Sequence, residues 1–196
     1  PGTRRWRFGL ADPAGPTTDE VVSSDAEELI LVDESDREIG HATKTACHDG
    51  PGILHRAFSI FVFNSSGHLL LQQRSAEKRL WPLFWSNSCC SHPRRGEDMD
   101  EATRRRLHQE LGLATELEHL FTFSYRARYK DLGSEREMCW VFAGSSDAEP
   151  RFNIREIADI RWIAPDALDR ELADTPERFT PWFKQEWPRV KEGLRG

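Results

Sequence analysis

Residues 97–113 read EDMDEATRRRLHQELGL, and this stretch is the clearest secondary-structure signal in the chain. It contains no proline, and its single glycine, Gly112, stands where a helix would end. The acidic residues at its start suit the partial positive charge of a helix N-terminus. We therefore predict a helix from Glu97 to Leu111 as the main helical element of the chain.

Short apolar runs separated by turn residues lie on both sides of this helix. Upstream, we predict strands at 28–32, near 38–40, at 58–63 and at 69–74. Downstream, we predict strands at 121–129, 138–142 and 160–163, and helices that begin at Pro165 and Pro181. This order of elements predicts an α+β fold, in which a mixed β-sheet is packed in layers with α-helices.

The domain organisation follows from length and local composition. Residues 1–27 are rich in Pro, Gly, Thr and Asp, so we predict an extended N-terminal arm there. The remaining residues, 28–196, are enough for one sizeable core, and we predict a single domain. We expect that domain to be a monomer.

The overall composition excludes several kinds of partner. The formal net charge is -6, which argues against a nucleic-acid surface, and no apolar run is long enough for a membrane span. Four cysteines are present, but the adjacent pair Cys89 and Cys90 does not suit a disulfide framework. We therefore expect free thiols and a cytoplasmic protein.

Two carboxylates stand at alternate positions in the segment 135–139, which reads EREMC. In a strand, residues two apart face the same side, so Glu135 and Glu137 would project together. A solvated strand end is the simpler interpretation. However, two carboxylates so close repel each other unless a cation or a shared proton lies between them, and a metal ion meets this need.

Nitrogen and sulfur donors occur in two other segments. Residues 87–93 read NSCCSHP, in which Cys90 and His92 share one side of an extended segment. His48 and His55 flank a Gly-Pro-Gly loop that could fold the two imidazoles together. Buried cysteines are usually inert, but a thiol beside a metal ion or an imidazolium is reactive. The three histidines would suit zinc, iron and related ions, and the glutamates would also admit manganese or magnesium.

The helix itself carries a degenerate sequence motif. Residues 97–113 resemble the Nudix box, G-x5-E-x7-R-E-U-x-E-E-x-G-U, which normally uses glutamates to hold magnesium on a diphosphate. The matching positions are Glu97, Arg105, Leu107, Glu110, Gly112 and Leu113. Ser91, Arg106 and Gln109 replace one glycine and two glutamates of the motif. The loss of carboxylates weakens the case for a hydrolase, because fewer metal charges can be neutralised.

Taken in order, these elements resemble the type I isopentenyl-diphosphate isomerases of the Nudix superfamily, which interconvert isopentenyl and dimethylallyl diphosphate for isoprenoid biosynthesis. The resemblance covers about residues 28–190, and the Cys-Cys-Ser-His-Pro form is its most specific part. It implies a Nudix fold with one divalent ion, zinc or manganese, held by three histidines and two glutamates. The matching ligands are His48, His55, His92, Glu135 and Glu137.

The resemblance also assigns the remaining site residues. Its catalytic positions fall on Cys90, Glu137, Tyr125 and Trp182. Its diphosphate-binding positions fall on Lys44, Arg74, Lys78 and Arg106, and Glu110 would help a magnesium ion bridge the substrate diphosphate. Double-bond transposition passes through a tertiary carbocation. An indole face would stabilise this cation, and two proton-transfer groups would act on opposite faces of the alkene.

Two other functions remain open at this point. A Nudix diphosphate hydrolase acting on a nucleotide or similar compound would share the helix motif, but it would give Cys90 no role. A zinc-binding interaction module would need closed, cysteine-rich coordination, and the cysteines here lack paired C-x2-C spacing.

Overall fold

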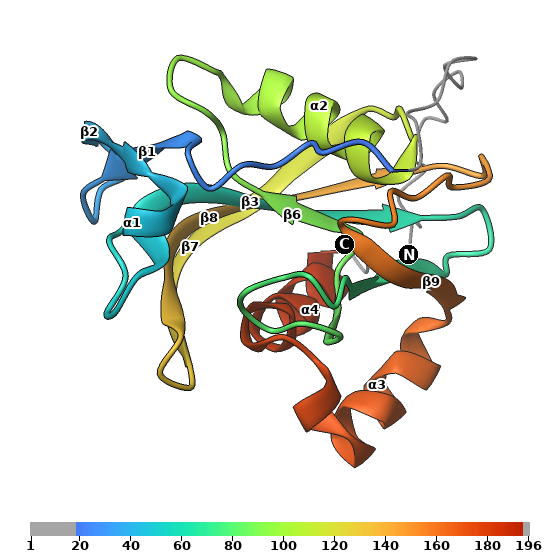
Figure 1. Cartoon of the computed structure of the whole chain (residues 1–196). Coiled ribbons are helices and arrows are strands. Elements are labelled where there is room, and N and C mark those ends of the chain that lie inside the picture. Colours follow the sequence, from blue (N-terminus) through green and yellow to red (C-terminus); the bar gives the residue numbers. More distant parts are fainter. Residues whose placement is uncertain (1–18, 194–196) are drawn as a thin grey trace.

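The computed structural model describes residues 19–193 (Figure 1). The chain begins with a hairpin of β1 (Glu28–Val32) and β2 (Glu38–Thr43), followed by the short helix α1 (Lys44–His48). The next strands are β3 (His55–Phe63), β4 (Leu69–Arg74), β5 (Trp85–Ser86), β6 (Cys89–Ser91) and, later in the chain, β8 (Gly133–Ser145). The remaining elements are α2 (Met99–Leu111), β7 (Leu117–Tyr129), β9 (Ile157–Ile163), α3 (Pro165–Asp174), η1 (Pro176–Arg178) and α4 (Pro181–Gly193).

The sheet is mixed, as predicted. Strand β3 pairs with β8 in parallel and with β1, β4 and β6 in antiparallel fashion. Strands β7 and β8 form a long antiparallel hairpin. The β3–β8 register pairs His55 with Glu137, so two of the predicted metal ligands start the parallel pair side by side.

Helices cover both faces of this sheet, with α2 on one side and α3 and α4 on the other (Figure 1). The core under α2 includes Leu107 and Leu111, and the core under α4 includes Phe183 and Trp187. Alternation along the strands decides which residue enters which core. Cys89 is buried on the α2 side, whereas Cys90 packs on the α4 side, as its alternate spacing predicts. The predicted α+β layered fold is confirmed.

Two boundaries differ from the sequence prediction for local reasons. Helix α2 begins at Met99 and not at Glu97, because Asp98 caps it by accepting a hydrogen bond from the Glu101 amide at 2.8 Å. Glu97 instead pairs with Arg105 at 2.6 Å, outside the helix. Helix α1 was not predicted, since its five residues are too few to give a periodic pattern.

The described part of the N-terminal arm, residues 19–27, lies against the domain. Its backbone carbonyls accept hydrogen bonds from side chains of the domain: Val22 from Arg106 at 2.9 Å and Glu20 from Asn153 at 2.7 Å. The Asp19 carbonyl accepts a further one from Arg155 at 2.7 Å. The rest of the predicted arm, residues 1–18, lies outside the described residues. Within 19–193, no helix has the length and apolarity needed to cross a membrane.

Candidate active site

A cavity of about 310 Å³ opens on the sheet between the N-terminal segment, α1 and α4. Most of the residues that the sequence singled out line it. These are Lys44, His48, Arg74, Lys78, Cys90, His92, Arg106, Tyr125, Glu135, Glu137 and Trp182. Side chains of distant segments thus meet in one polar pocket large enough for a small molecule.

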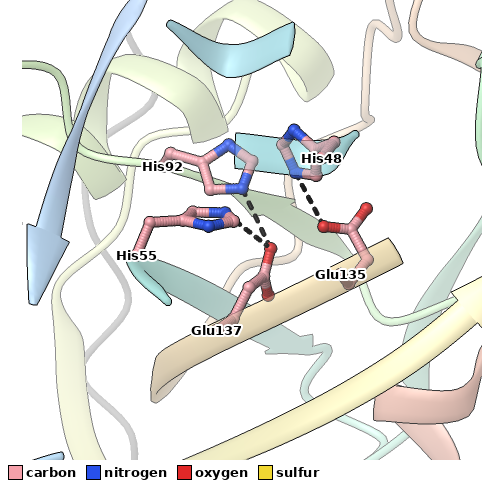
Figure 2. Close-up of side chains that lie close together, drawn as sticks. All are labelled: His48, His55, His92, Glu135 and Glu137. Atoms are coloured by element: carbon pink, nitrogen blue, oxygen red, sulfur yellow. Dashed lines mark hydrogen bonds and ion pairs between the residues drawn. The ribbon is translucent and has the colours of Figure 1, made fainter. Parts of the chain in front are cut away.

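One end of the cavity holds the five predicted metal ligands (Figure 2). The possible donor atoms of His48, His55, His92, Glu135 and Glu137 all lie within 4.8 Å of one another. His48 Nε2 lies 2.7 Å from Glu135 Oε2, and His92 Nε2 lies 2.9 Å from Glu137 Oε1. Sequence spacing only suggested that the two loop histidines and the two strand glutamates could meet. In the structure they converge.

Strand pairing and one glycine bring these ligands together. Glu135 and Glu137 alternate on β8 beside His55 of β3, and His92 follows β6, which pairs with β3. His48 ends α1, directly beside the start of β8 at Gly133. A Cβ atom at Gly133 would lie 2.3 Å from the His48 carbonyl oxygen, so only glycine permits this approach.

Backbone carbonyls orient two of the three imidazoles. His48 Nδ1 lies 2.7 Å from the Lys44 carbonyl, and His55 Nδ1 lies 2.7 Å from the Ile53 carbonyl. Carbonyls only accept hydrogen bonds, so each Nδ1 carries a proton, and Nε2 of each ring is the nitrogen left to face the cluster. A metal-ligating histidine typically uses its second ring nitrogen in this way.

Burial and neighbouring charges keep His92 and Glu137 in the forms that bind a cation, whereas at His48 burial is outweighed by contacts with the Glu135 carboxylate, which raise the pKa. Burial, together with His55 and His48, lowers the pKa of His92 well below its ordinary value, so this ring is neutral. Burial acts to raise the pKa of Glu137, but contacts with His55 and Tyr125 outweigh it and hold the pKa below its ordinary value. Neutral imidazoles and ionised carboxylates are the forms that bind metals.

The donor set fits a divalent metal ion. His55 Nε2 is fully buried, has no hydrogen-bond partner among the described residues, and lies 3.6 Å from Glu137 Oε1. An unpaired buried nitrogen is costly unless something binds it. Three imidazoles and two carboxylates suit ions such as zinc, manganese or iron. All five predicted ligands could therefore hold one ion.

The predicted catalytic side chains lie next to this cluster. Tyr125 donates a 2.5 Å hydrogen bond to Glu137 Oε2, and burial beside Glu137 raises the pKa of this phenol well above its ordinary value. Burial raises the pKa of the Cys90 thiol to about 12, although the Arg74 guanidinium opposes the shift. At neutral pH Cys90 therefore carries a proton and Glu137 does not.

Aromatic rings close the apolar part of the cavity. Trp182, at the start of α4, is 3% exposed and packs edge-on against Trp81 with ring centroids 5.3 Å apart. The Arg74 guanidinium lies 5.3 Å from the Trp182 ring and 3.9 Å from Cys90 Sγ. Hydrogen bonds to the carbonyls of Leu80 and Trp81, each 3.0 Å long, fix this arginine.

The other end of the cavity holds three of the four predicted diphosphate-binding cations, Lys44, Lys78 and Arg106, around the carboxylate of Glu156. Glu156 accepts a hydrogen bond from Lys78 and one from Arg106, the latter at 3.1 Å. Burial acts to raise the pKa of Glu156, but Lys78 and Arg106 hold it at about 2. Burial, with Lys78 and Arg106 nearby, lowers the pKa of Lys44. Glu156 thus partly balances a dense group of positive charges.

Two glutamates, Glu110 and Glu156, occupy positions that the sequence did not predict. Glu110, the predicted magnesium ligand, is buried behind the cavity wall and forms an ion pair with Arg106. Glu156 follows no motif that marks it, and only its position after Asn153 in a turn brings it to the cavity. Sequence spacing alone could not have found it, because its partners lie 50 and 78 residues away.

Comparison with known proteins agrees with this geometry. Residues 53–183 match the NUDIX domain family. A curated relative from Photorhabdus laumondii, named isopentenyl-diphosphate Delta-isomerase 1, is 41% identical over 166 residues, spanning 84% of this chain and 94% of the relative. The isopentenyl-diphosphate Delta-isomerase of Burkholderia multivorans is 46% identical over 157 residues, spanning 80% and 89%.

Solved structures agree on the fold. A protein from Deinococcus radiodurans, DR0079, superposes with a TM-score of 0.62 at 28% identity, covering 76% of this chain and 90% of that one. The MutT protein of Methanosarcina mazei has a TM-score of 0.60 at 15% identity, covering 73% and 96%, and supports the fold alone.

The fold, the helix motif and the cavity together define a Nudix protein. Within that superfamily, the identity and coverage of the curated relatives show that the chain belongs to the isopentenyl-diphosphate Delta-isomerase family.

Proposed function

We propose that this protein is an isomerase that interconverts isopentenyl diphosphate and dimethylallyl diphosphate, and so supplies isoprenoid biosynthesis. The observation that carries the proposal is the meeting of Cys90, Glu137 and Trp182 with the four predicted diphosphate-binding cations in one cavity. The family relatives carry this activity in their names.

The proton-transfer groups would be Cys90 and Glu137. One group adds a proton to the terminal alkene carbon, which leaves a tertiary carbocation, and the other removes a proton from the neighbouring methylene. The protonated thiol and the ionised carboxylate are complementary at the start of such a cycle. Tyr125 would hold the Glu137 carboxylate in place, and the ring of Trp182 would stabilise the cation.

The cationic end of the cavity would hold the diphosphate. Lys78 and Arg106 are fixed by Glu156, Lys44 lies nearby, and Arg74 reaches the Cys90 side. These side chains would keep the diphosphate from leaving while the carbocation exists. Charge-assisted hydrogen bonds from arginine suit phosphate oxygens particularly well.

Two metal ions belong to the proposal. A zinc or manganese ion would be held by His48, His55, His92, Glu135 and Glu137, where it would fix the Glu137 carboxylate and tune its acidity. Magnesium would bind with the substrate diphosphate and Glu110. For Glu110 this requires a rearrangement of its ion pair with Arg106.

We further propose a monomer that acts in the cytosol on a small-molecule substrate. The four cysteines, Cys47, Cys89, Cys90 and Cys139, are all free thiols. Free thiols fit a reducing compartment.

The test is an assay of the purified protein with isopentenyl diphosphate in heavy water. We expect dimethylallyl diphosphate that has gained deuterium from the solvent. Release of phosphate or pyrophosphate without formation of the isomer would contradict the proposal and indicate a Nudix hydrolase.

A further inference from the structure

Helix α4 presents a carboxyl group to the sheet that the proposed mechanism does not use. Glu186 is fully buried at 0% exposure, and its Oε1 lies 3.5 Å from Cys139 Sγ. Its second oxygen, Oε2, is buried and has no hydrogen-bond partner within residues 19–193. A carboxyl group in the core is uncommon and calls for a specific reason.

Glu186 is one of three polar residues that touch each other in this core. Cys139 Sγ also lies 3.5 Å from Ser59 Oγ, so the thiol stands between the hydroxyl and the carboxyl group. We call Ser59, Cys139 and Glu186 the buried polar cluster. Apolar residues of the α4-side core, such as Val141 and Phe183, are its neighbours in that core.

The buried polar cluster joins β8 and α4, which carry Glu137 and Trp182, to β3, which pairs with the strand that carries Cys90. Ser59 on β3 is the register partner of Cys90 on β6. Cys139 lies two residues after Glu137 on β8, on the same side of the strand. Glu186 lies one helical turn after Trp182 on α4.

Burial keeps the carboxyl group of this cluster neutral. It raises the pKa of Glu186 to about 8, although polar contacts with Ser59 and Cys139 favour the ionised form. A neutral carboxyl group can donate a hydrogen bond as well as accept one. It therefore links the helix to the sheet without placing a second full negative charge behind Glu137.

We propose that Glu186 is a positioning residue, which holds Trp182 on α4 in register with Cys90 and Glu137 on the sheet through Cys139 and Ser59. This inference rests on the proposed roles of Cys90, Glu137 and Trp182. The diphosphate-binding cations come from α1, β4, the loop after β4, and α2, so the cluster does not hold them. Loss of the link should therefore lower kcat and leave KM nearly unchanged.

The test compares Glu186→Leu and Glu186→Gln in the metal-loaded protein with isopentenyl diphosphate. Leu removes the hydrogen-bonding group at similar volume, and we expect kcat to fall about 10- to 100-fold, the cost of a misplacement of about 1 Å, with KM within about two-fold of wild type. Gln keeps a neutral hydrogen-bonding group, and we expect it to restore kcat to within about three-fold of wild type. Metal content should be the same in both variants.

A matched control and a milder variant make the outcome decisive. Val190→Ala removes buried volume from the same helix one turn further on, and we expect its kcat to stay at the wild-type level. If Glu186→Leu does not fold, Ser59→Ala takes its place. It removes the contact between Ser59 Oγ and Cys139 Sγ by the loss of one hydroxyl, and kcat should fall while KM stays constant.

Three results would overturn the inference. The first is an unchanged kcat in Glu186→Leu, or in its substitute Ser59→Ala. The second is a fall in kcat that is equally large in Glu186→Gln and Glu186→Leu. The third is a fall in kcat in Val190→Ala that equals the fall in Glu186→Leu. The wild-type protein and Cys90→Ala, assayed beside them, separate this inference from the proposed function. A wild-type protein that does not isomerise the substrate contradicts the proposed function itself.

Discussion

The two ends of the cavity hold two groups of buried charge that are balanced in different ways. At the diphosphate end, Arg106 pairs with Glu110 and Glu156, and Lys78 pairs with Glu156, so protein cations and anions neutralise each other. At the metal end, two carboxylates face three imidazoles, of which His92 is held neutral. The first group is partly balanced within the protein, whereas the second has a set of donors that could hold a cation from outside.

This difference explains how a degenerate Nudix box can remain in a functional site. Arg106 occupies a helix position where the motif has a glutamate. It forms an ion pair with Glu110, the glutamate that remains of the adjacent pair in the motif. The carboxylates of the cluster that could hold a metal ion are found instead on β8, at Glu135 and Glu137. In the proposed function, Arg106 of the helix therefore serves anion binding, and the metal ligands come from α1, β3, β8 and the residue after β6.

The largest expected effect concerns the proton-transfer pair at the metal end. Cys90→Ala and Glu137→Gln should each lower kcat by about 10³-fold or more, because each removes a group that transfers a proton in the reaction. Steady-state isomerase assays measure this. Cys89→Ala is the matched control, since that thiol lies in the core on the opposite face of the sheet, and it should keep wild-type kcat. Near-normal turnover in either Cys90→Ala or Glu137→Gln would refute the assigned roles.

Removal of the metal should have the next largest effect. It should distinguish the metal end of the cavity from the diphosphate end. Dialysis against a chelator should lower activity about 10²-fold and also lower Tm, because the protein loses ligand-linked stability and five buried ligands lose their cation. Elemental analysis and thermal unfolding follow the loss, and zinc or manganese should restore both properties. A metal-free protein with full activity would show that the metal end does not depend on an ion.

Glu156 provides a stability test at the diphosphate end. Its pKa is about 2 in the folded protein, below the ordinary 4.5, so it contributes stability above pH 4.5 that is lost as pH falls through 2. Glu156→Gln should therefore lower the free energy of unfolding by about 3 kcal/mol at pH 7. Urea unfolding from pH 7 down to pH 2 should show the difference from wild type shrinking. A constant difference would mean that ionisation of Glu156 contributes nothing.

Glu186 should show the opposite dependence of stability on pH. Its folded pKa of about 8 lies above 4.5, so its contribution to stability is present below pH 4.5 and is lost as pH rises through 8. Glu186→Gln, which does not ionise, should gain stability relative to wild type as pH rises between these values. Tm measured at several pH values gives the comparison. A wild-type Tm that runs parallel to that of the variant would contradict a buried neutral carboxyl group.

Local sequence signals were enough to predict most of the elements of this fold. The helix 99–111 has a cap, a regular pattern and a terminal glycine, and the hairpin of β3 and β4 has a polar turn between two apolar runs. Strand ends were less accurate: β8 begins at Gly133, whereas the apolar run that predicted it begins at Met138. The polar residues 133–137 are strand because they pair with β7, which is a tertiary effect.

The site was predictable only where spacing or family resemblance carried the information. The alternation of Glu135 with Glu137, and of Cys90 with His92, gives the shared direction of each pair. The approach of His48 to Glu135 depends on the contact of α1 with β8 at Gly133, which no local pattern contains. Glu156 and Glu186 gain their roles from partners far away in sequence, so single-sequence reasoning had no signal for either.

The hydrogen bonds that hold residues 19–22 use carbonyl groups of the main chain and not side chains. Since every amino acid offers the same carbonyl, evolution can replace the exposed side chains of this stretch freely, except at Val22, which is buried. A deletion or insertion of one residue would instead move all three carbonyls away from Arg106, Asn153 and Arg155. We therefore expect this stretch to vary widely in sequence among relatives while its distance from β1 stays constant.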